Sequence, residues 1–65
     1  MNEIEKKAIE TAYAGKVSLL FDVLTSNFLT ADGIAEKEKE AEESFMRGVK
    51  LMKHARDRAT ALLGT

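Results

Sequence analysis

Cysteine, proline and tryptophan are absent from this chain of 65 residues. Without cysteine the protein has no disulfide, no thiol chemistry and no zinc site built on sulfur. A single histidine, His54, is too few for a zinc or iron site of the usual kind. We therefore expect no metal and no cofactor. Association with another chain is the remaining way for so short a chain to gain stability.

Several functional signatures are also missing. The sequence has no phosphate-binding glycine loop, no nucleophile paired with a base, and no Glu-x-x-His pair of the di-iron type. We therefore expect no catalytic residue and no enzyme. The sequence shows no secretory signal, and no apolar run reaches the roughly 20 residues that a membrane span needs. The expected location is the cytoplasm, without membrane contact.

The composition and the spacing of apolar residues favour long helices. Charged residues make up 32% of the chain and apolar residues 45%. Asn2 with Glu5 matches a capping box, and Thr30, Asp32 and Gly33 supply the one strong turn signal, with Thr30 and Asp32 as candidate caps for the next helix. The sequence predicts a single all-α domain, an antiparallel two-helix hairpin over residues 1–65. Its helices are expected at about 3–29 and 33–63, with a turn at 30–33.

The second predicted helix has one apolar stripe with the spacing of a coiled-coil seam, interrupted only by Glu38. The stripe consists of Ile34, Ala41, Phe45, Gly48, Met52, Ala55, Ala59 and Leu62. The rest of this helix is polar. Burial of one side of this helix therefore covers its apolar stripe.

The first predicted helix has two apolar stripes, centred about 130° apart at 100° per residue. One consists of Ala8, Ala12, Gly15, Leu19 and Val23. The other consists of Ile9, Tyr13, Val17, Leu20, Leu24 and Phe28, with Phe21 at its edge. A turn near residue 31 or 32 places Gly15 opposite Gly48. We therefore expect the stripe containing Gly15 to face the second helix, with the two glycines marking a close helix crossing.

The remaining stripe then requires cover from another molecule, because exposed apolar surface costs about 25 cal/mol per Å². We expect a homodimer that forms an antiparallel four-helix bundle. Its interface is predicted to consist of Tyr13, Val17, Leu20, Phe21, Leu24 and Phe28. A different protein in the same groove is the alternative. A small-molecule pocket beside Tyr13 is less favoured, because such small interiors fill with side chains.

Charge separates along the second helix. Residues 36–43 hold five Glu and two Lys, whereas residues 47–58 hold five Lys or Arg and one Asp. This order complements the helix dipole, which is a sufficient structural explanation. A functional alternative is a phosphate-contact ridge formed by Arg47, Lys50, His54 and Arg58. The leading expectation is a non-catalytic protein-interaction module, such as an adaptor, co-chaperone or regulator. A nucleic-acid-binding regulator is the alternative.

Overall fold

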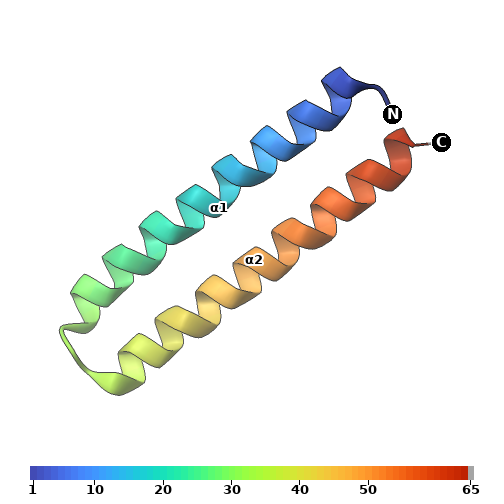
Figure 1. The fold of residues 1–65 in the computed structure, drawn as a ribbon. Helices are drawn as coiled ribbons and strands as arrows, with labels where there is room; N and C mark the ends of the chain where they lie inside the picture. The colour runs from blue at the N-terminus through green and yellow to red at the C-terminus, as the bar shows by residue number, and fades with distance from the viewer. Residues whose placement is uncertain (65) are drawn as a thin grey trace.

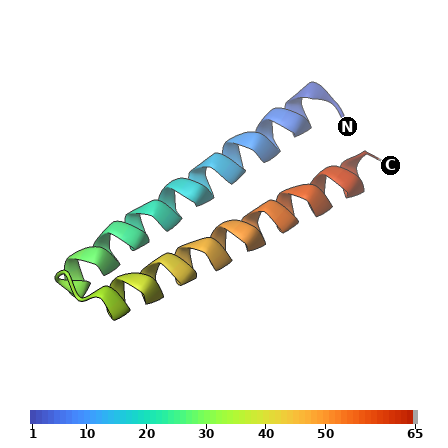
Figure 2. The same ribbon diagram turned by 60° about the horizontal axis from the view of Figure 1, so that its bottom comes forward.

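The computed structural model describes residues 1–64 and shows two antiparallel helices joined by a short turn. Helix α1 spans Glu3–Ala31 and helix α2 spans Ala35–Leu63. The helices lie side by side along their whole length, and the start of α1 and the end of α2 lie at the end opposite the turn (Figures 1 and 2). The prediction of an all-α helical hairpin is confirmed.

Helix α1 begins with the capping box that its sequence predicts. The Glu5 backbone N–H donates to the Asn2 side chain at 2.7 Å, and the Asn2 backbone N–H donates to the Glu5 carboxylate at 3.1 Å. Two donors that a helix start would leave unpaired are satisfied in this way. Glu3 and Glu5 also place negative charge at the positive end of the helix dipole.

Helix α1 ends in a left-handed turn, two residues beyond its predicted end. Asp32 has φ 50° and Gly33 has φ 80°, a conformation that glycine adopts without steric cost. The Asp32 N–H donates to the Phe28 carbonyl at 3.2 Å, and the Ile34 N–H donates to the Ala31 carbonyl at 3.0 Å. These bonds close α1 and reverse the chain direction.

The predicted capping roles of Thr30 and Asp32 at the start of the second helix are wrong. Thr30 lies inside α1, where its hydroxyl donates to the Ser26 carbonyl at 3.1 Å. Asp32 closes α1, and the N-cap of α2 is Ile34, which makes no side-chain capping bond. The turn therefore rests on backbone geometry at Asp32 and Gly33.

The side of α1 that faces α2 differs from the expectation. The second stripe is partly buried in the hairpin, through Ile9, Tyr13, Val17, Leu20 and Leu24. The first stripe is exposed, with Leu19 57% and Val23 53% accessible. The larger side chains of the second stripe bury more apolar area in the hairpin than alanine and glycine would, and apolar burial is the main stabilising term.

Gly15 and Gly48 differ in what lies beside them. A Cβ at position 48 would lie 2.7 Å from Leu20 Cδ2, so the Leu20 side chain fills the space that Gly48 leaves open. A Cβ at position 15 would meet no atom within 4 Å. The predicted pairing of Gly15 with Gly48 at a helix crossing is therefore wrong. Within the hairpin nothing compensates the roughly 0.5–1 kcal/mol that a helical glycine costs at position 15.

The side of α2 that faces α1 also differs from the predicted seam. Val49 and Arg56 are half-buried, although neither belongs to the predicted seam. Ala55 and Leu62 belong to the predicted seam, yet Ala55 is exposed and Leu62 is 67% accessible. Both helices thus turn part of their apolar surface to the same side of the hairpin.

The hairpin has very little interior. Among residues 1–64 only Ala31 and Ala41 are buried, and both are small. The Cα radius of gyration is 15.0 Å, against about 11 Å for a compact domain of this length. The accessible surface is 5156 Å², whereas a compact monomer of 7.2 kDa exposes about 4,100 Å². The excess, about 1,000 Å², is mostly a consequence of the flat, elongated shape.

Replacing Gly48 tests the contact with Leu20. Gly48→Leu should lower the free energy of unfolding by about 1–3 kcal/mol, because the new side chain overlaps Leu20. Leu20→Ala in the same chain should recover part of that loss, because it empties the space. Urea denaturation of the two single variants and the double variant measures the coupling. Strictly additive effects would show that the two positions do not share this space.

Candidate interaction surfaces

The predicted interface residues divide into two groups in the structure. Four of them form the α1 half of the hairpin's own seam: Tyr13, Val17, Leu20 and Leu24 are each half-buried. Phe21 and Phe28 lie at the edge of that seam, 55% and 38% accessible. The same stripe therefore serves the intramolecular packing. Contact of these six residues with a second chain stays a prediction.

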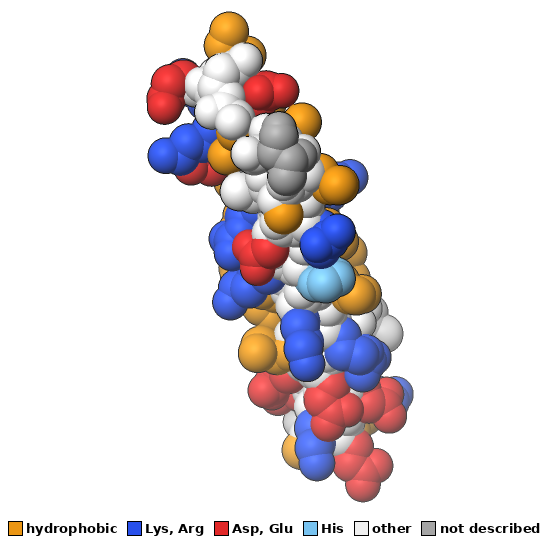
Figure 3. Space-filling view, turned by 90° about the vertical axis from the view of Figure 1, so that its right-hand side faces the viewer, with side chains coloured by type: hydrophobic (Ala, Val, Ile, Leu, Met, Phe, Trp, Pro, Cys, Tyr) orange, Lys and Arg blue, Asp and Glu red, His pale blue; other side chains and the backbone are white. Residues whose placement is uncertain are grey.

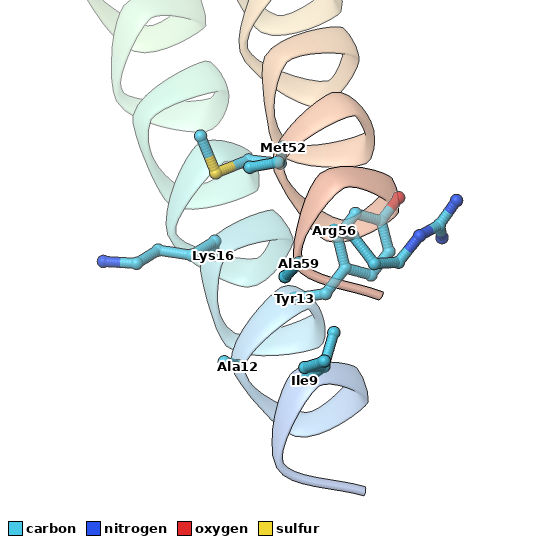
Figure 4. A pocket seen from close by; sticks show the side chains of 8 residues that line it. Ile9, Ala12, Tyr13, Lys16, Met52, Arg56 and Ala59 are labelled. Carbon is cyan, nitrogen blue, oxygen red and sulfur yellow. The ribbon is translucent and has the colours of Figure 1, made fainter. Parts of the chain in front are cut away.

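An aromatic and cationic pair spans the helices toward the open end of the hairpin. The Arg56 Cζ lies 4.6 Å from the centre of the Tyr13 ring, a cation–π geometry. Asp57 holds the same guanidinium, with 3.2 Å between Arg56 Nη2 and Asp57 Oδ1. In Figure 4 the Tyr13 side chain reaches from α1 to α2. Half-burial of Arg56 is thus explained by its stem and its ring contact.

An apolar hollow lies between the helices beside this pair (Figure 4). It is lined by Ile9, Ala12, Tyr13, Lys16, Met52, Ala55, Arg56 and Ala59. The Lys16 side chain points away from the gap between the helices. The hollow exists because alanine is too short to close the gap between the two backbones. Ala12 and Ala55, on one rim of the hollow, also belong to a larger surface.

That larger surface, which we call the uncharged face, is formed by one side of both helices. At 100° per residue its members share a side of their helix. A second, smaller hollow joins Val23 and Asn27 of α1 to Ala41 and Ser44 of α2, and so places the two sides together. The members are Ala8, Ala12, Gly15, Leu19 and Val23 of α1, and Ser44, Leu51, Ala55 and Leu62 of α2.

The nine residues named carry no charge, and the larger side chains among them are well exposed. Charged residues lie around them on the same side, with Glu5 and Lys37 at the two ends of the face and Lys16 and Arg58 at its edges. Leu51 is 63% accessible and Leu62 67%, similar to Leu19. The opposite side of the hairpin also has apolar members, Phe21 and Met46, but there they alternate with charged residues. Those charged residues are Glu10, Glu42 and Lys53. Because charged groups are depleted from the centres of protein interfaces, the uncharged face is the better candidate for contact with protein.

The predicted basic ridge lies on a third surface. Arg47, Lys50, His54 and Arg58 are all exposed, and their spacing places them on the side of α2 that faces away from α1. Figure 3 shows Lys and Arg side chains around the single histidine, with acidic side chains gathered toward the turn. The structure therefore brings the four ridge residues together on one exposed line.

Within residues 1–64, no group of three or more His, Asp or Glu side chains is arranged so that it could hold a metal ion. Neither described helix combines the length and the continuous apolar sequence that crossing a bilayer requires.

The chain matches no protein-family model, no curated protein and no solved structure.

Proposed function

We propose that the chain is a non-catalytic protein-interaction module that acts as a homodimeric four-helix bundle. The observation that carries this proposal is the nearly absent core, with two alanines as the buried residues of the described chain. A 65-residue hairpin with so little interior gains stability by sharing a core with a second hairpin. Four helices around one core are a stable and common solution for such hairpins.

The available surface is sufficient for such a dimer. A standard interface buries about 800 Å² on each partner. The hairpin exposes about 1,000 Å² more than a compact chain of its mass. Pairing two flat hairpins face to face removes the excess and produces a bundle of ordinary proportions. The role that follows is presentation of the outer helix surfaces to a further partner, as in an adaptor, co-chaperone or regulator.

Dilution tests the dimer. Light scattering coupled to size exclusion should give twice the chain mass of 7.2 kDa at high concentration. The melting temperature should rise with protein concentration, because association stabilises only the folded state. A fully helical chain that stays at 7.2 kDa and melts independently of concentration would remove the proposal.

A nucleic-acid-binding regulator is the second candidate, favoured by one observation. The four ridge residues lie together on an exposed surface that the hairpin does not use for packing. A dimer presents this ridge twice. Phosphate contacts need this kind of exposed cationic line and no catalytic group.

Salt dependence tests the ridge. If three of its side chains contact phosphates, affinity for a DNA duplex should fall about 40-fold between 50 and 200 mM salt. Replacing Arg47, Lys50 and Arg58 together by Gln should abolish most of that dependence, measured by fluorescence anisotropy. The control replaces Lys37 and Lys39 by Gln on the acidic half of α2. Absence of binding at 50 mM salt would eliminate this candidate.

A further inference from the structure

We infer that the uncharged face is the surface that binds the second copy of the chain, with the turns of the two hairpins at opposite ends of the dimer. The inference rests on the proposed dimer and names its interface. It also differs from the expectation drawn from the sequence, which gave that role to the stripe now partly buried within the hairpin.

Exposure and charge together select this face. Leu19, Leu51 and Leu62 are all more than half exposed, and all belong to it. Phe21 on the other side of α1 is nearly as exposed as Leu19, but there Glu42 and Lys53 lie among the apolar residues, whereas the charged residues near the uncharged face lie at its ends and edges. A second copy would have to desolvate those charges, which costs far more than desolvating alanine or serine.

Gly15 supplies an independent reason. It lies on the uncharged face, and nothing in the hairpin occupies the space beside it. In α1, Val17 is the middle residue, with Gly15 and Leu19 at equal distances on its two sides. When two copies of α1 cross antiparallel at their middles, Leu19 of one copy therefore lies over Gly15 of the other. The missing side chain and the protruding one are then complementary.

The charges on α2 select the orientation. Its first half, residues 36–43, has an excess of three negative charges, from five Glu and two Lys. Its second half, residues 47–58, has an excess of four positive charges, from five Lys or Arg and one Asp. With the turns at opposite ends, each α2 lies antiparallel to the other α2, and the acidic half of one copy lies beside the basic half of the other. With the turns at the same end, like-charged halves share that end.

Two lysine substitutions identify the face. Leu19 and Phe21 have nearly equal exposure, 57% and 55%, yet point to opposite sides of α1. Leu19→Lys should raise the dimer dissociation constant at least about 100-fold, because it buries an unpaired charge. Phe21→Lys should change it less than about threefold. Sedimentation equilibrium measures both values.

A substitution that the hairpin tolerates distinguishes loss of the dimer from unfolding of the chain. Gly15→Leu enters open space and improves helix propensity, so circular dichroism should show an intact helical chain. The same variant should lose the dimer, whereas Ala14→Leu, the matched control on the other side of α1, should keep it. A dimer lost in Phe21→Lys or Ala14→Leu but kept in Leu19→Lys and Gly15→Leu would overturn the choice of face. A wild-type chain that is monomeric at every concentration would overturn the proposed function itself.

A single introduced cysteine tests the orientation, since the chain has none of its own. Glu36→Cys places a spin label on an exposed position in the first turn of α2, 13 residues from its middle. With the turns at opposite ends, the two labels should lie about 40 Å apart, from the rise of 1.5 Å per residue. Electron–electron double resonance that gives about 20 Å, as neighbouring helix ends would, overturns the orientation but leaves the choice of face standing.

Discussion

Two helices that pack side by side touch along one line of side chains, and in this protein that line buries little. Ala31 and Ala41 are buried, while the larger apolar residues of the seam keep part of their surface in water. Helix α1 has apolar residues on two sides, so whichever side faces α2, the other is exposed. The flat shape, the thin seam and the uncharged face all follow from this geometric constraint.

The sequence predicted the local features of the fold well, because each depends on a few neighbouring residues. The capping box at Asn2 and Glu5, the reversal at Asp32 and Gly33 and both long helices are of this kind. The rotation of each helix about its own axis was predicted wrongly. A difference of about 130° between two apolar stripes is invisible to spacing alone, since both satisfy helical periodicity. The register of the two glycines was a misleading guide, because Leu20 fills the space beside Gly48.

The candidate surfaces also divide into one that the sequence of a single helix predicts and one that depends on how the two helices are placed. The basic ridge needed only the periodicity of one helix, and its four residues lie together as expected. The uncharged face needed the relative placement of two helices, which the sequence did not supply. Its signal was nevertheless present: Leu51, Ala55 and Leu62 follow one another on one flank of α2, where Arg58 is the charged residue between them. The ridge and the uncharged face adjoin on α2, because Arg47 and Arg58 lie beside Leu51 at helical spacing.

The two buried alanines also show where along the hairpin the packing is tightest. Ala31 adjoins the turn and Ala41 lies in the second turn of α2, so the tightest packing is beside the reversal at Gly33. Contacts there close short loops, whereas a contact such as that of Tyr13 with Arg56 closes a long one. Pairing the helices beside the turn therefore costs less loop-closure entropy than pairing them near their free ends. The Tyr13–Arg56 contact lies where that cost is largest.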